Sequence, residues 1–289
     1  FGSPLGGSAN LVAISYLEGI CGHEFMYIDW VSRFLPFLIL TMLLNLVILL
    51  SIKLPVKKLA NTKAYFNDMY KQLGPMSKGE KIGLGLFIIS TVLAFARPLF
   101  AEALPALRPA YIFFICGLLT FMLHDEDGKV LLTWKQAEKE LMWGMFFLFA
   151  GGLALGQLVT GTGAATKLAD VITVMPLTGG IETIFAFTAF STILTEVSSN
   201  TAAASIAIPI IQSISEALGL NVVPYILVTI VAVNCAYILP VSTRAIPIGY
   251  GLEPSELFKH GVLLSVLNVI LTTAVGYIFI NYWPAFGQI

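Results

Sequence analysis

Long apolar runs separated by short polar segments occupy most of this chain. A helix needs about 20 apolar residues to cross a bilayer. The clearest runs of this kind cover residues 34–52, 82–100, 110–123, 141–159, 224–239 and 262–282. Two further segments are also membrane-like: residues 11–20, and residues 184–214, where polar residues interrupt the run near its middle. The pattern predicts an all-α membrane protein with several spans.

The composition agrees with this prediction. Hydrophobic residues make up 57% of the 289 residues and charged residues only 11%, against about 25% charged residues in ordinary soluble domains. A soluble fold would have too little polar surface to cover itself. The formal net charge of −1 gives no argument for nucleic-acid binding. We therefore expect a multi-pass integral membrane protein in the lipid bilayer, with no nucleic-acid partner.

A basic segment follows the first long run. Residues 53–81 contain seven lysines and only two acidic residues, Asp68 and Glu80. The positive-inside rule places such a segment in the cytoplasm. Its partly amphipathic pattern favours an interfacial helix, and a solvated basic loop is the alternative.

Interrupted apolar runs occur near both ends of the chain and suggest a weak internal repeat. Near the start, Gly2-Ser3-Pro4 leads through an apolar stretch to a long span, and near the end Val241-Ser242-Thr243-Arg244 does the same. Repeats with discontinuous helices are typical of secondary transporters whose site lies near the bilayer midplane.

The sharpest motif is the polar interruption at residues 195–204, which contains Ser198-Ser199-Asn200-Thr201. A polar stretch inside an apolar run predicts a hairpin of two half-helices whose tip lies within the membrane. Ser, Asn and Thr are preferred at helix starts, where free N–H groups and the helix dipole favour an anion. Their side-chain oxygens also suit a small cation. A plain helix cap without a ligand is the alternative.

A second polar interruption covers residues 239–247, where Pro240 and Pro247 bracket Ser242, Thr243 and Arg244. Proline breaks a helix, and an arginine at membrane depth is a functional candidate by default. Its guanidinium matches a carboxylate. The alternative is an arginine whose side chain extends to the membrane interface and binds no ligand. The Gly-rich stretch at residues 2–10 permits unwound backbone but reads equally well as a surface turn.

Together these motifs resemble the divalent anion/sodium symporter family of di- and tricarboxylate transporters. The resemblance rests on Ser199-Asn200-Thr201 as a hairpin tip, on Leu239-Pro240-Val241-Ser242-Thr243 as a helix break, and on Gly2-Ser3-Pro4 as the matching break of an earlier repeat. It covers nearly the whole chain. Because the family's early helices and first Ser-Asn-Thr hairpin have no counterpart in this sequence, we expect a truncated or incompletely represented transporter.

The resemblance implies an inverted-repeat, elevator-type transporter with a re-entrant hairpin and discontinuous helices, which forms a homodimer and needs no cofactor other than a coupling sodium ion. It implies the following domains: 1–52 as part of the transport domain, 53–82 as a cytoplasmic arm helix, 83–165 as scaffold and dimerisation helices, 166–182 as a connecting arm, and 183–289 as transport domain with hairpin, broken helix and last span. It further implies roles for single residues. Substrate binding would fall to Ser199, Asn200, Thr201, Thr243, Arg244, Ser3 and Pro4, and sodium binding, if the protein is sodium-coupled, to Thr195, Ser198, Asn200, Ser242 and Gly2.

One departure from the family affects the expected coupling. Many members have Pro-Pro-Asn where this chain has Arg244-Ala245-Ile246. A dicarboxylate needs positive charge from some source to cross hydrocarbon. Sodium can leave after each crossing and an arginine cannot, so Arg244 favours exchange over sodium symport. The resemblance implies transport of C4 and C5 dicarboxylates of the malate, succinate, fumarate and 2-oxoglutarate type, and we expect this across the plasma (inner) membrane.

Three alternatives accompany this interpretation. A sodium-coupled dicarboxylate or sulfate symporter has the same general architecture. A non-transporting membrane scaffold subunit would not need broken helices with polar tips. An intramembrane enzyme would need a catalytic pair at membrane depth, and no histidine or aspartate lies in the middle of a span. We therefore expect that the chain is not an enzyme.

Overall fold

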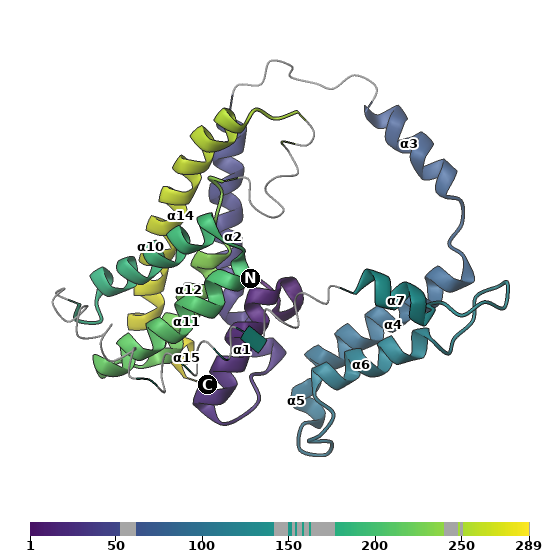
Figure 1. Ribbon diagram of the computed structural model, residues 1–289, viewed down its shortest axis with the longest axis horizontal. Helices are drawn as coiled ribbons and strands as arrows, with labels where there is room; N and C mark the ends of the chain where they lie inside the picture. Colours follow the sequence, from purple (N-terminus) through teal and green to yellow (C-terminus); the bar gives the residue numbers. More distant parts are fainter. Residues whose placement is uncertain are drawn as a thin grey trace. The chain divides into compact units, whose positions relative to one another are not determined.

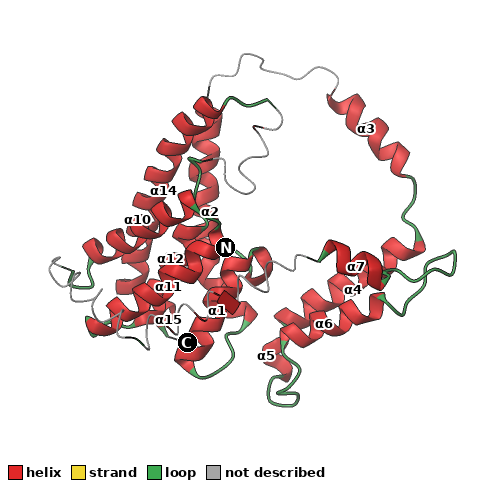
Figure 2. Ribbon diagram, in the orientation of Figure 1, coloured by secondary structure: helices red, strands yellow, loops and turns green. Residues whose placement is uncertain are grey.

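The computed structural model describes residues 1–52, 62–141, 177–239 and 251–288, with single positions 150, 151, 154, 158, 162 and 248. Within these ranges the elements are helices, apart from an isolated β-bridge between His124 and Val130, as Figure 2 shows. The elements in chain order are η1 (Pro4–Gly6), α1 (Ser8–Cys21), α2 (Tyr27–Ser51), α3 (Thr62–Leu73), α4 (Lys78–Phe95), α5 (Arg97–Phe100), α6 (Pro109–Thr120), α7 (Trp134–Glu140), α10 (Ile181–Val197), α11 (Asn200–Ala217), α12 (Val222–Val233), α14 (Pro254–Tyr282) and α15 (Pro284–Gly287). The expected all-α class is confirmed for these residues.

The chain divides into two compact units. The first combines Phe1–Ser51 with Trp143–Ile289, and the second is Ile52–Met142. Both ends of the chain belong to the first unit (Figure 1). The finer division into transport domain, arms and scaffold stays a prediction.

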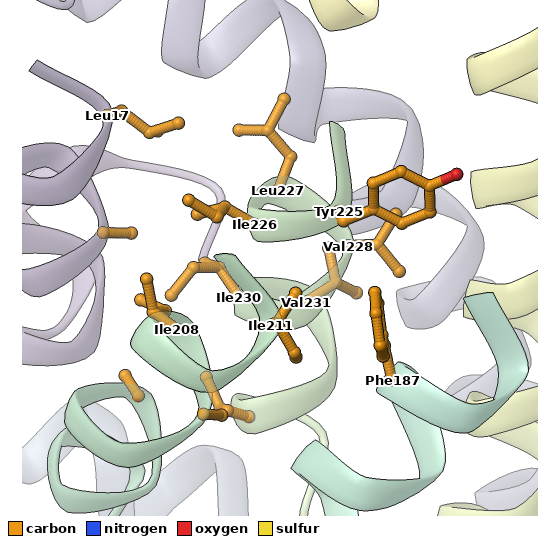
Figure 3. Close-up of a cluster of buried hydrophobic side chains, with 14 of the residues drawn as sticks. Leu17, Phe187, Ile208, Ile211, Tyr225, Ile226, Leu227, Val228, Ile230 and Val231 are labelled. Carbon is orange, nitrogen blue, oxygen red and sulfur yellow. The ribbon is translucent and has the colours of Figure 1, made fainter. Parts of the chain in front are cut away.

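Helix α12 forms the centre of the first unit. Every one of its residues is buried, and it packs against α10, α11, α14 and α1. A helix that is hydrophobic all round must be enclosed on all sides, and Figure 3 shows side chains of α12 between those of Leu17, Phe187 and Ile208. The helix begins after Asn221, whose side-chain oxygen accepts a hydrogen bond from Val223 N at 3.1 Å.

The interrupted apolar run consists of two helices that pack against each other, α10 and α11. α10 ends at Val197, and Ser198 and Ser199 are extended. The Ser199 hydroxyl then accepts a hydrogen bond from Ala202 N at 3.2 Å and caps α11. The predicted break between two half-helices is therefore confirmed, and its position inside a membrane stays a prediction.

The run expected at residues 224–239 is helical over a shorter range, because α12 ends at Val233. The Asn234 side chain donates a hydrogen bond to Ile230 O at 2.9 Å and closes the last turn. Residues 235–239 are not helical, so the helix ends several residues before Pro240. The sequence placed the break too late: the helix ends at Val233 and not at the proline.

Helices α2 and α14 are the two described helices that are long and apolar enough to cross a bilayer by length and composition. Their 25 and 29 residues correspond to about 38 and 44 Å at 1.5 Å per residue. They pack against each other. Apolar side chains of α2 such as Met42, Val47 and Leu50 are exposed, as expected for a surface that faces lipid.

The second unit is built on the pairing of α4 with α6. Ser77 and Glu80 form a capping box at the start of α4. The run expected at residues 82–100 is divided, since α4 ends at Phe95 and the short helix α5 follows. Arg97, at the start of α5, is buried and donates hydrogen bonds to the carbonyls of Leu104 and Pro105, both at 3.0 Å.

Helix α3 in the same unit agrees with the helix expected in the basic segment. Its apolar side chains at positions 65, 66, 69, 70 and 73 are all exposed and recur at helical spacing. Residues 53–61, which hold three of the seven lysines, lie outside the described residues.

Candidate functional site

The starts of two helices meet in the first unit. The hydroxyls of Ser8, at the start of α1, and Thr201, at the start of α11, form a hydrogen bond across 193 residues of sequence. The first four N–H groups of any helix have no partner within the helix. Ser199 accepts one of them at α11, whereas α1 follows Gly7, which has no side chain to cap it. Donors from two helices therefore point into one region.

A chain of side-chain amides connects these helix starts to the end of α12. Asn10 donates to Ser3 O at 2.8 Å, and Asn234 donates to the side-chain oxygen of Asn10 at 3.3 Å. Asn200 in turn donates to the side-chain oxygen of Asn234 at 3.5 Å. Asn10 is fully buried, so these hydrogen bonds satisfy groups that water cannot reach.

The ends of α10 and α12 supply oxygens at the same place. Thr195 Oγ1 lies 2.8 Å from the backbone carbonyl of Val233 and 2.9 Å from Asn200 Oδ1. Helix C-termini carry partial negative charge on their last carbonyls. Hydroxyl, amide and backbone carbonyl oxygens are the ligands that hard cations prefer. The donor set around Thr195 therefore fits a sodium ion, while the helix starts beside it fit an anion.

Beside this region, a buried carboxylate holds the non-helical segment that follows α12. Glu196, 6% exposed, accepts hydrogen bonds from the backbone N–H groups of Tyr237 (2.8 Å), Ile238 (3.0 Å) and Leu239 (3.1 Å). Ser265 of α14 donates a fourth, at 2.8 Å. These four donors satisfy both carboxylate oxygens.

The structure brings together most of the predicted substrate residues that it describes. Asn200 and Thr201 lie at the meeting point, Ser199 caps α11, and the Ser3 carbonyl is joined to the amide chain. The Ser3 hydroxyl forms a hydrogen bond with Tyr27 Oη at 2.6 Å, and the neighbouring Pro4 is buried at the start of η1. The predicted residues Thr243 and Arg244 lie outside the described residues.

The residues predicted to bind sodium divide into two groups. Thr195 and Asn200 are adjacent, whereas the Ser198 hydroxyl donates to Leu194 O of its own helix at 2.7 Å. A Cβ atom on Gly2 would lie 2.7 Å from Leu38 Cδ2, so this glycine allows close packing against α2. Ser242 lies outside the described residues.

Sequence reasoning missed two residues of the amide chain as parts of the site. Asn10 and Asn234 are not among the predicted site residues, and neither is Glu196, which lies beside the amide chain. The available signal was their position: each is a strongly polar residue within or directly beside an apolar run, where an unsatisfied polar group is costly.

The sequence model of one protein family, described as the sodium:sulfate symporter transmembrane region, matches residues 5–289. The chain belongs to this family. The resemblance to the divalent anion/sodium symporters is thereby confirmed.

Individual members of the symporter family cover the chain almost completely. A sodium-dependent dicarboxylate transporter, SdcS, from Staphylococcus saprophyticus is 25% identical over 96% of this chain and 56% of its own length. SdcS from Staphylococcus aureus is 27% identical over 89% of the chain and 51% of its own length. An uncharacterized transporter from Haemophilus influenzae is 30% identical over 96% of this chain and 59% of its own length. The chain thus spans about half the length of the curated relatives it matches.

Membership of the symporter family decides two of the expectations. The family and these relatives are transporters and not enzymes, which confirms that part of the prediction. A transmembrane family also confirms that the chain is a multi-pass integral membrane protein.

Proposed function

We propose that this protein is a secondary transporter that carries C4 and C5 dicarboxylates across the plasma (inner) membrane together with sodium. The proposal includes an elevator mechanism in a homodimer with inverted repeats. The names of the Staphylococcus relatives state sodium-dependent dicarboxylate transport for those proteins, which supports sodium as the coupling ion here.

The observation that carries the proposal is the meeting of two helix starts and two helix ends. α1 and α11 begin at the Ser8–Thr201 contact, and α10 and α12 end at the Thr195–Val233 contact. Helix starts stabilise a carboxylate, and helix C-termini with unwound carbonyls coordinate a sodium ion, in transporters built from discontinuous helices. One region with both features suits an anion that travels with a cation.

Roles for individual residues follow from this arrangement. We assign the carboxylate to Ser199, Asn200 and Thr201 together with Ser3 and Pro4. Thr195 and Asn200 would hold a sodium ion through their side-chain oxygens, with Ser198, Ser242 and Gly2 as further candidates. Thr243 and Arg244 complete the proposed substrate set.

Uptake into proteoliposomes that contain the full-length protein tests the proposal. We expect labelled succinate to accumulate with an inward sodium gradient, and to do so at least tenfold more slowly with potassium in place of sodium. Asn200→Ala should abolish uptake because it removes an amide from both proposed sites. Labelled sulfate is tested in the same vesicles, and uptake of sulfate without any dicarboxylate uptake would contradict the substrate assignment.

Exchange is the second candidate, and Arg244 is the residue that favours it. A fixed guanidinium would neutralise part of the substrate charge in place of a sodium ion, and it would resist return of the empty carrier. Uptake that requires dicarboxylate inside the vesicles and does not depend on sodium would support exchange. Sodium-driven uptake into empty vesicles would exclude it.

A further inference from the structure

A single side chain of α10 accepts hydrogen bonds from three consecutive residues of the non-helical segment after α12. Three consecutive N–H groups, those of residues 237–239, point at the Glu196 carboxylate. Consecutive backbone N–H groups of this kind form an anion-binding nest, and here the anion belongs to the protein itself. In a membrane protein an unsatisfied backbone N–H group is costly, so the carboxylate stabilises the unwound segment.

The same segment is held from two other directions, which leaves it little freedom to adjust. A Cβ atom on Gly261 of α14 would lie only 2.1 Å from the Tyr237 carbonyl oxygen, so the backbones of α14 and the segment are in direct contact. The Tyr237 hydroxyl accepts a hydrogen bond from Asn45 of α2 at 3.0 Å. The segment therefore cannot move closer to α14 to absorb a change in the length or charge of Glu196.

Glu196 also stands at a particular place in its own helix. It follows Thr195, whose hydroxyl contacts Asn200, and it precedes Asn200 by four residues. One side chain thus connects the break between α10 and α11 to the segment that leads towards Ser242 and Thr243.

We propose that Glu196 is a positioning residue for transport: it keeps the α10–α11 break and residues 237–239 in fixed register, so that Thr195 and Asn200 stay assembled with the end of α12. This inference rests on the proposed function. A carboxylate that only satisfies nearby hydrogen-bond donors would affect the stability of the fold and leave the transport constants unchanged. A carboxylate that sets the register also affects the concentrations of substrate and sodium at which transport is half-maximal.

Glu196→Gln is the direct test because it keeps the size of the side chain and replaces one acceptor oxygen by an amide group that only donates. At least one of the three N–H groups then faces a donor. We expect the half-saturation concentrations of substrate and of sodium each to rise at least tenfold, in protein that still elutes as a single folded species. Wild-type values in the folded variant would overturn the proposal.

Ser265→Ala keeps the inference testable if Glu196→Gln does not fold. It removes one hydroxyl and leaves the carboxylate on the three backbone N–H groups, so the change is small. We expect a two- to fivefold rise in both half-saturation concentrations, and unchanged values would overturn the proposal.

Glu182→Gln is the matched control at the other end of α10, about 21 Å away along the helix. Glu182 also accepts hydrogen bonds from the backbone N–H groups of Thr178 and Gly180 and from the hydroxyls of Thr178 and Thr183. This variant should keep both half-saturation concentrations within twofold of wild type. A rise equal to that of Glu196→Gln would show a general effect of α10 and would also overturn the proposal.

The two proposals fail in different ways in these measurements. If wild-type vesicles take up no dicarboxylate, the proposed substrate is wrong. The variants are then compared with wild type for the anion that is taken up, with sulfate as the first choice. The ratio of variant to wild type tests the positioning role in either case.

Discussion

Replacement of Gly261 by alanine should be among the most damaging single-methyl changes in the first unit. The added Cβ atom would lie 2.1 Å from the Tyr237 carbonyl oxygen, 2.7 Å from its carbonyl carbon and 2.9 Å from Ile238 Cα. All three are backbone atoms, so no side chain can rotate away. To restore even a tight contact, α14 and the segment must separate by about 1 Å, and overpacking of this kind costs about 1–3 kcal/mol and occasionally more.

The separation would also lengthen the hydrogen bonds from Tyr237 and Ile238 to Glu196. We therefore expect Gly261→Ala to lower the free energy of unfolding by about 3 kcal/mol, the upper end of this range. Thermal unfolding of the detergent-solubilised protein measures the effect. Gly276→Ala should cost less, since its Cβ would meet the side chain of Val228 at 2.9 Å. Gly85→Ala has nothing within 4 Å and should be neutral or stabilise α4 by up to ~1 kcal/mol through helix propensity. Equal melting temperatures for Gly261→Ala and Gly85→Ala would refute the reasoning.

Four further predictions concern polar side chains inside the first unit. Asn234→Ala removes the middle of the amide chain and should lower the free energy of unfolding by about 1–3 kcal/mol, because the side chains of Asn10 and Asn200 lose a partner; an unchanged melting temperature would contradict this. Thr192→Val should leave the melting temperature unchanged or raise it, since the Thr192 hydroxyl is buried without a partner among the described residues. Thr195→Val, one turn further along α10, should lower the melting temperature and raise the sodium half-saturation, because that hydroxyl contacts Val233 O. Arg33→Gln should cost about 1–3 kcal/mol in the same unfolding assay, as Arg33 donates to the Gln288 carbonyl at 2.6 Å.

Helix positions could be predicted from the sequence, whereas some helix ends could not. An apolar run with a polar interruption at Ser198-Ser199 is sufficient to place two half-helices, because Ser and Asn cap helices through contacts within a few residues. The end of α12 depends on a different kind of contact. Residues 235–239 carry apolar or aromatic side chains and would extend the helix by local preference. The N–H groups of residues 237–239 instead bond to a carboxylate some forty residues earlier in the chain.

The candidate site shows the same division between local and distant information. Thr195, Asn200 and Thr201 could be predicted because they form one continuous polar motif. The joining of Ser8 to Thr201 and of Asn10 to Asn234 requires the packing of α1 on α11 and α12, which nothing in the local sequence specifies. A buried asparagine is recognisable from sequence, but its partner is not, since several amide and hydroxyl groups along the chain have matching donors and acceptors.

The electrostatics of the break explain why a carboxylate can lie beside a site for an anion. A bare negative charge at Glu196 would oppose a dicarboxylate bound near the break, with little screening in a low-dielectric interior. Its four donors place positive hydrogen atoms against both oxygens, as a helix start does for a bound anion. Thr195, the residue before Glu196, presents its hydroxyl to the last carbonyl of α12. If a sodium ion binds at Thr195 as proposed, the nearby Glu196 charge would strengthen that binding by Coulomb attraction, and one residue would then both hold the unwound segment and favour the proposed cation.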